Sequence, residues 1–247
     1  MEFLDASHNA LEVLCEDLKE MIALTHLNVA YNRLSLLPLG LGNCRMLRLL
    51  DASRNRLNTL PESFRDLVSL EYCNLEHNLI RVSDEPSLSL NQQIQNGKKV
   101  VSVLSLQVEK DQRVSLLDGL IALKVLNLGF NRMQTLGLGS MAGRVGGGGL
   151  FSMTSLDLSN NNLLSLPGEI GLLQQMLSLT LKGNDLTNIP PEIGSLSSLT
   201  TLNLSCNKLK LLPDMIGQVR SIQELDLSDN SDLACLPRTV IGLVQVH

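Results

Sequence analysis

Few residues in this chain combine a reactive type with a spacing that suits catalysis. No Ser, His and acid set stands out, and no pair of acids is spaced for acid–base work. His8, His26 and His77 belong to a metal-binding residue type, but they lack the matched spacing of a metal site. We therefore expect no enzyme activity, no metal and no cofactor in this chain.

The glycine run Gly146–Gly149 is the remaining candidate for cofactor chemistry. A phosphate-binding loop needs Gly-Lys followed by Ser or Thr at the start of a helix. Here Leu150 and Phe151 follow the glycines instead. The run is better interpreted as a flexible hinge or insertion than as a nucleotide site.

Asparagine supplies the most regular chemistry in the sequence. Its side chain both donates and accepts hydrogen bonds, so it can pair with backbone groups that are buried at a turn. Nine asparagines occupy one place in the frame Leu-x-x-Leu-x-Leu-x-x-Asn-x-Leu, 23 residues apart except at two longer intervals. We predict a structural ladder in which each Asn bonds its own coil and adjacent ones. Its members are Asn9, Asn32, Asn55, Asn78, Asn131, Asn161, Asn184, Asn207 and Asn230.

The frame also predicts the elements that position these amides. Apolar residues at positions 4 and 6 alternate with polar ones, which is typical of a short strand. The other half of each repeat carries Leu-Pro-x-x-Ile-Gly-x-Leu, which suits a short helical turn that begins near Pro and ends near Gly171, Gly194 or Gly217. A helix is about twice as wide as the spacing of parallel strands, so the strands should line the concave face of an arc.

This pattern resembles the leucine-rich repeat family over nearly the whole chain. The 23-residue period and the Leu-Pro-x-x-Ile-Gly-x-Leu half are similar to the intracellular, Ras-associated scaffold type. The fold class is then α/β: a curved horseshoe with a parallel β-sheet on its concave face and short helical or 3₁₀ turns on its convex face. The resemblance also implies that a protein binds on the concave face.

One solenoid of about ten coils is predicted over residues 1–247. The fifth coil should be degenerate and weak, because Glu109 occupies the Asn position and lacks an amide donor. Neither end carries a distinct polar cap, so we expect a longer repeat array or a second molecule that covers the ends. The predicted segments are regular coils at 1–80, an insertion at 81–100, degenerate and regular coils at 101–136, a Gly-rich insertion at 137–150 and regular coils at 151–247.

Charge and cysteine content narrow the classes of partner. The chain has 20 basic and 25 acidic residues and a net charge of −5, which does not indicate binding to nucleic acid or to an anionic membrane. No stretch approaches the ~20 apolar residues of a membrane span, and residues 1–20 do not resemble a signal peptide. Five widely spaced cysteines favour a reducing, cytoplasmic location.

The concave face is where we expect a partner to bind. In the first six predicted coils, aromatic, histidine and arginine residues gather at positions that should point out of this face. Such residues are enriched at interface hot spots. The alternative is that the aromatic rings pack across the strands and only stabilise the face. The predicted binding residues are Phe3, His8, His26, Tyr31, Arg33, Arg54, Arg56, Tyr72, His77, Phe130 and Arg132.

The sequence therefore favours a non-enzymatic protein-interaction scaffold in intracellular signalling or complex assembly. The expected partner is a protein, with a small GTPase or a phosphatase or kinase complex as the kinds that the resemblance suggests. The alternative is a regulatory segment of a larger kinase, phosphatase or cyclase whose catalytic domain lies outside this chain. A ligand-recognition ectodomain is disfavoured by the missing cysteine caps and signal peptide.

Overall fold

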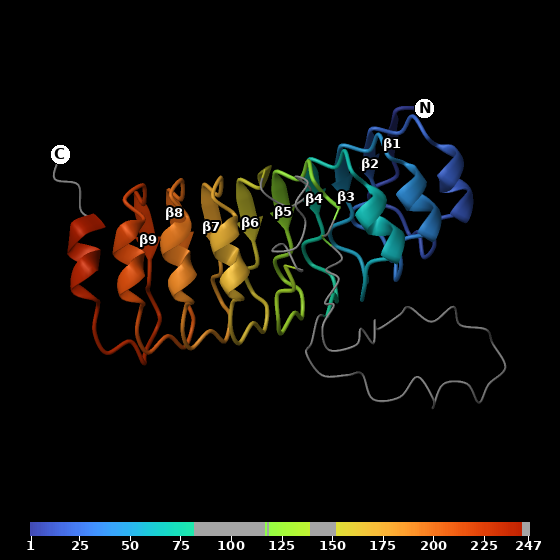
Figure 1. Ribbon diagram of the computed structural model, residues 1–247. Coiled ribbons are helices and arrows are strands. Elements are labelled where there is room, and N and C mark those ends of the chain that lie inside the picture. Colours follow the sequence, from blue (N-terminus) through green and yellow to red (C-terminus); the bar gives the residue numbers. More distant parts are fainter. Residues whose placement is uncertain (82–116, 118, 139–151, 244–247) are drawn as a thin grey trace, which may run out of the picture.

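The computed structural model describes residues 1–81, 117, 119–138 and 152–243. Within these residues, nine three-residue strands form one parallel sheet in the order of the chain (Figure 1). The strands are β1 (Phe3–Asp5), β2 (His26–Asn28), β3 (Leu49–Asp51), β4 (Tyr72–Asn74), β5 (Val125–Asn127), β6 (Ser155–Asp157), β7 (Ser178–Thr180), β8 (Thr201–Asn203) and β9 (Glu224–Asp226).

The register of the sheet is constant from strand to strand. Phe3 is paired with His26, and each later pair joins the same positions of the frame. The register holds where the sequence interval is longer, since Tyr72 is paired with Val125 and Val125 with Ser155. Every position of the frame therefore forms a straight row of side chains along the solenoid.

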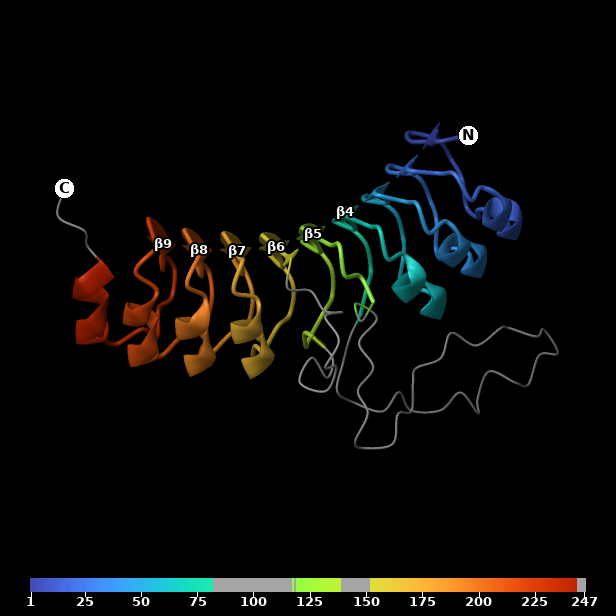
Figure 2. The same ribbon diagram turned by 45° about the horizontal axis from the view of Figure 1, so that its top comes forward.

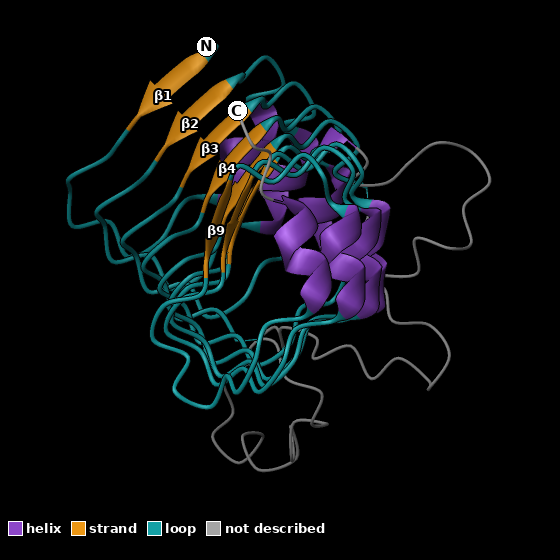
Figure 3. Ribbon diagram, turned by 90° about the vertical axis from the view of Figure 1, so that its left-hand side faces the viewer, coloured by secondary structure: helices purple, strands orange, loops and turns teal. Residues whose placement is uncertain are grey.

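Short 3₁₀ helices occupy the side opposite the strands. Figures 2 and 3 show the helices on the outer side of the arc and the strands on its inner side, as predicted. A proline precedes five of the described helices as the N-cap residue, at η2, η3, η8, η9 and η10. The helices are η1 (Glu16–Glu20), η2 (Leu39–Asn43), η3 (Glu62–Asp66), η8 (Gly168–Leu172), η9 (Pro191–Ser195), η10 (Asp214–Gln218) and η11 (Arg238–Leu243).

The glycines of these helices have a different role from the predicted one. Gly171, Gly194 and Gly217 do not end their helices, because each is followed by one more helical residue before the C-cap. Instead they allow close contact between neighbouring helices. A Cβ at Gly194 would lie 2.6 Å from the carbonyl oxygen of Met215 in the next coil. Each helix ends one residue after its glycine, close to the predicted place, and the constraint on the glycine is one of packing.

Leucine builds the core, which runs between the sheet and the helices through all the described coils. Cys73 takes a leucine place in this core and is fully buried. Burial raises the pKa of its thiol well above the ordinary range. Phe64 is the one aromatic side chain in the core of the described residues. The other aromatic side chains in the described residues are exposed or half-buried.

The structure contains nine described coils, close to the predicted ten. The expected fifth coil, around residues 101–106 and Glu109, lies outside the described residues, as do most of both predicted insertions. The sheet itself shows that no coil separates β4 from β5, because these strands pair directly. In this respect the prediction of an extra layer at that point was wrong.

A candidate protein-binding face

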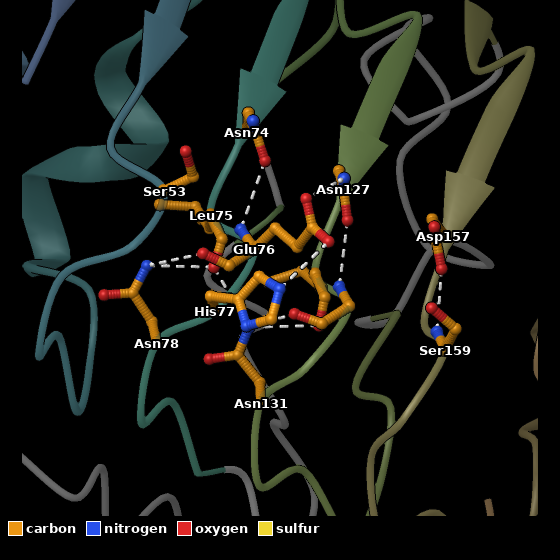
Figure 4. Close-up of polar contacts among 12 residues, drawn as sticks. Ser53, Asn74, Leu75, Glu76, His77, Asn78, Asn127, Asn131, Asp157 and Ser159 are labelled. Atoms are coloured by element: carbon orange, nitrogen blue, oxygen red, sulfur yellow. Dashed lines mark hydrogen bonds and ion pairs between the residues drawn. The ribbon is translucent and has the colours of Figure 1, made fainter. Parts of the chain in front are cut away.

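The asparagine ladder holds neighbouring coils together through both ends of each amide. Asn131 donates from Nδ2 to the carbonyl oxygens of Leu128 at 3.0 Å and Gly129 at 3.1 Å in its own coil. It also donates to the carbonyl oxygen of Leu75 in the preceding coil at 3.0 Å (Figure 4). Its Oδ1 accepts the N–H of Ile80 at 2.9 Å. Each bond satisfies a backbone group that would otherwise be buried without a partner. The predicted structural role is confirmed.

Asn9 differs from the other eight because the described chain holds no coil before it. It is exposed, and its Nδ2 donates only to Ala6 and Ser7 of its own coil. The eight others are buried. The ladder therefore depends on the presence of a neighbour on the N-terminal side.

A second polar row, at position 5 of the frame, escaped the sequence analysis. In all described coils but the seventh, where Thr180 occupies it, this position is Asp or Asn. Its side-chain oxygen accepts the backbone N–H two residues on, for example from Gly129 to Asn127 at 2.9 Å and from Ser159 to Asp157 at 2.8 Å (Figure 4). These Asx turns bend the chain away from the sheet at the end of each strand. The signal was present in the sequence as a column of Asp and Asn.

The hydroxyl and N–H groups at these turns also affect the carboxylates that accept from them. The side-chain and backbone bonds from Ser7 lower the pKa of Asp5, and the bonds from Ser228 lower that of Asp226. A carboxylate that is held ionised in this way is a fixed acceptor at neutral pH. Position 5 thus forms a row of polar side chains along the middle of the concave face, and the oxygens of its Asp and Asn members are hydrogen-bonded to the backbone.

The residue before each ladder asparagine has an unusual backbone. His8, Tyr31, Arg54, His77 and Phe130 all have φ between 53° and 56°. This left-handed conformation is rare for bulky side chains and costs roughly 1–2 kcal/mol per residue. Glycine occupies the same place at Gly183 and Asn at Asn160, which are residues that tolerate it. Sequence reasoning placed these residues in a row without detecting this conformation.

Two rows of large side chains lie on the face over β1–β5, and we call them together the N-terminal ridge. In the position 8 row, the rings of His8 and Tyr31 stack at 4.2 Å, and so do those of His77 and Phe130. Arg54 lies over the Tyr31 ring at 5.2 Å. The position 3 row consists of Phe3, His26, Leu49, Tyr72 and Val125; the position 8 row consists of His8, Tyr31, Arg54, His77 and Phe130.

These contacts mean that the rings do pack across the coils, as the stabilising alternative supposes. They nevertheless leave much aromatic surface in water. Phe3 is 61% exposed, Tyr31 46% and Phe130 43%. Tyr72 is half-buried, and burial, with a smaller effect of Asp51, raises the pKa of its hydroxyl. The rings therefore both pack across the coils and present exposed aromatic surface.

Arginines flank the ridge at position 10 of the frame. Arg33, Arg56 and Arg132 are exposed, and their backbone N–H groups are fixed by carbonyls of the preceding coil. Within the described residues, none of these arginines, nor Arg54, has an ion-pair partner. The structure therefore brings together all eleven residues that we predicted to contact a partner along the first five described coils.

The second half of the face differs in chemistry. Over β6–β9, position 3 is occupied by Ser155, Ser178, Thr201 and Glu224. At position 10, Lys208 pairs with Asp185 at 2.6 Å. The side chains of this half are mostly small and polar. The change occurs between β5 and β6.

No arrangement for chemistry was found in the part of the chain that the structure describes. No group of three or more His, Cys, Asp or Glu side chains there could hold a metal ion. The five cysteines are free, and Cys44 and Cys73 are buried. Among the described helices, none has the length and apolar content to cross a membrane.

Comparison with known proteins gives matches to repeat models and to solved structures. Models described as leucine rich repeat match residues 22–80, 152–173 and 174–231, which together exceed half of the chain. No curated protein matches the chain. Among solved structures, an internalin (InlF) from Listeria monocytogenes has a TM-score of 0.71 at 18% identity, over 100% of this chain and 60% of its own.

Two further structures are more similar in sequence. A leucine-rich repeat protein of Leptospira interrogans has 25% identity and a TM-score of 0.58, over 97% of this chain and 63% of its own. The PEPR1–AtPEP1 structure has 25% identity and a TM-score of 0.66, over 92% of this chain and 28% of its own. The chain thus spans less than two thirds of the length of each of these structures.

Proposed function

Because the chain belongs to the leucine-rich repeat family, we propose that it is a non-enzymatic protein-interaction module whose concave face binds a protein partner. The observation that carries this proposal is the exposed N-terminal ridge over β1–β5. Large apolar rings on a rigid, in-register sheet offer contact area at low entropic cost, and aromatic residues and Arg are enriched at hot spots. The PEPR1 structure, at 25% identity, is a complex with AtPEP1, which agrees with this use of the fold.

We further propose that the module serves as a signalling scaffold in the cytoplasm, with a small GTPase or a phosphatase or kinase complex as partner. The Ras-associated type of repeat and the five free cysteines support this assignment. On this proposal the partner-contacting residues are the eleven predicted from the sequence.

The ridge can be tested with a substitution that respects its backbone. In the double variant Tyr31→Asn with Phe130→Asn, both rings are removed while the left-handed conformation is retained, because Asn160 already holds it with φ of 53°. We expect capture of partner proteins from a lysate to fall about tenfold or more, since buried aromatic anchors typically contribute ~2 kcal/mol or more each. Quantitative mass spectrometry after affinity purification measures the loss.

The matched control is Cys206→Asn with Asp229→Asn. It introduces asparagine at position 8 of two coils in the polar half, where no aromatic ring is removed. The thermal melting temperature is recorded for both double variants. Binding lost only in the ridge variant, at an unchanged melting temperature, supports the proposal. If the ridge variant captures the same proteins as the wild type, or only melts earlier, the concave ridge is not the binding site.

A further inference from the structure

Over the first five described coils, the rows at positions 8 and 10 are basic although the chain as a whole is acidic; we call their four arginines the arginine row. In the first five described coils these two rows hold four arginines, Arg33, Arg54, Arg56 and Arg132, and no Asp or Glu. The chain carries a net charge of −5, so this concentration of positive charge is local. A local field of this kind draws in a partner of opposite charge.

Neighbouring acids do not neutralise these arginines. Asp51 and Glu76 lie on the same face, but among the described residues neither forms an ion pair with these arginines: Asp51 accepts the N–H of Ser53 at 2.9 Å, and Glu76 lies 3.5 Å from the ring nitrogen of His77. Parallel coils are about 4.7–4.9 Å apart, so Arg33 and Arg56 in adjacent coils place like charges side by side. Like charges opposite one another in a sheet are destabilising.

In the polar half the same two rows hold two acids, Asp185 and Asp229, and one base, Lys208, so the excess of arginine is confined to the first half. There Lys208 forms a 2.6 Å ion pair with Asp185 of the preceding coil. Among the described residues, the four arginines of the first half have no ion-pair partner, so their charge is available to another molecule.

We propose that the arginine row binds an acidic, aromatic- or leucine-containing segment of a protein, laid along β1–β5. Its carboxylates would meet Arg33, Arg56 and Arg132, and its apolar side chains would contact the rings of Tyr31 and Phe130. Arginine suits this role because its planar guanidinium accepts a carboxylate in a two-point contact and also stacks on aromatic rings, as Arg54 does on Tyr31. This inference rests on the proposed function and names the chemical class of its partner.

Nucleic acid fits the surface less well. A phosphate backbone carries charge at every step, and it would have to pass the carboxylates of Asp5, Asp51 and Glu76 on the same face. A peptide can instead place its carboxylates only at the arginine row. The arginine row is also short: its three position 10 members, Arg33, Arg56 and Arg132, span four coils.

The test uses the triple variant Arg33→Gln, Arg56→Gln and Arg132→Gln, with Lys182→Gln, Lys208→Gln and Lys210→Gln as the control of equal charge change in the polar half. The probe is a fluorescently labelled copolymer of glutamate and tyrosine, and its binding is followed by fluorescence anisotropy at low salt.

We expect the arginine variant to bind the copolymer about tenfold more weakly, as the loss of three exposed charge pairs predicts. The lysine variant should bind within about twofold of the wild type. The melting temperature of the arginine variant should be equal to or above that of the wild type, because like-charge repulsion is removed.

Three outcomes would overturn the inference: no binding of the copolymer by the wild type, equal loss in both triple variants, or equally tight binding of an oligothymidylate probe. These outcomes are separable from failure of the proposed function. If Tyr31→Asn with Phe130→Asn abolishes partner capture while the arginine variant binds the copolymer as the wild type does, the ridge binds proteins and only the acidic partner class is wrong.

Discussion

At the scale of single residues, the fold depends on side chains that bond two coils at once. The amide of each buried ladder asparagine satisfies carbonyls in its own coil and both an N–H and a carbonyl in the coil before it. Asn131 makes the same bonds across the longest interval between ladder asparagines, because it contacts Leu75 and Ile80 of the coil before it. No other side chain of similar size offers donor and acceptor together in this geometry except its homologue Gln, whose extra methylene would displace both.

Replacement of this amide should be costly in the interior and mild at the first coil. Asn131→Ala leaves the N–H of Ile80 and the carbonyl of Leu75 without their partner, and we expect a loss of about 2–4 kcal/mol in the free energy of unfolding. Asn9→Ala, the matched control, should cost less than about 1 kcal/mol because Asn9 is exposed. Urea denaturation followed by circular dichroism measures both. Equal effects would show that the ladder bonds between coils contribute no net stability.

At the scale of elements, no strand or helix here is long enough to be stable alone. The strands have three residues and most of the 3₁₀ helices five, so each exists through contact with its neighbours in the stack. The helices must approach closely enough to match the sheet on the other side of the core. Glycine provides that approach at Gly171, Gly194 and Gly217, where the carbonyl of the next coil lies within 2.6 Å of the missing Cβ.

A methyl group at such a glycine should therefore push two helices apart. We expect Gly194→Ala to lower the free energy of unfolding by about 1–3 kcal/mol, because the clash is with the backbone of Met215 and cannot be relieved by a rotamer change. Gly137→Ala is the control, since nothing lies within 4 Å of its Cβ position. It should be neutral or slightly stabilising. A Gly194→Ala protein that melts like the wild type would contradict the packing role.

At the scale of the whole molecule, the solenoid is continuous in structure although the sequence period is not. Tyr72 and Val125 pair as any other two neighbours do, and Glu71 forms a 2.7 Å ion pair with Lys124 across the same join. Leu117 and Leu120 supply the same core places as Phe64 and Leu67 one coil earlier. The described part of the fourth coil thus has the composition of a regular repeat.

This continuity predicts that the long interval can be shortened without loss of the fold. Residues 82–116 are replaced by Thr-Leu-Pro-Glu-Ser, the sequence of residues 59–63, which restores a 23-residue spacing between Tyr72 and Val125. We expect an unchanged circular dichroism spectrum and a gain of about 1–2 kcal/mol in stability from the shorter loop. A second variant, in which five glycines replace residues 82–116, is the control: it has the same shortened length but lacks the repeat sequence. Aggregation or a lost strand signal in the first variant would show that residues 82–116 are required for the fold.

The sequence by itself determined the repeat, the parallel sheet on the concave side, the Asn ladder and the gathering of aromatic and arginine residues in the first coils. These follow from local periodicity, because a fixed frame on stacked coils puts like positions in one row. Tertiary structure alone decided three matters: the direct pairing of β4 with β5, the close helix contacts at the glycines, and the left-handed backbone at Tyr31 and its equivalents. The first two depend on contacts between residues in different coils, which no local pattern contains. The third is a backbone conformation that the bulky residues at this position rarely adopt, so their types did not indicate it.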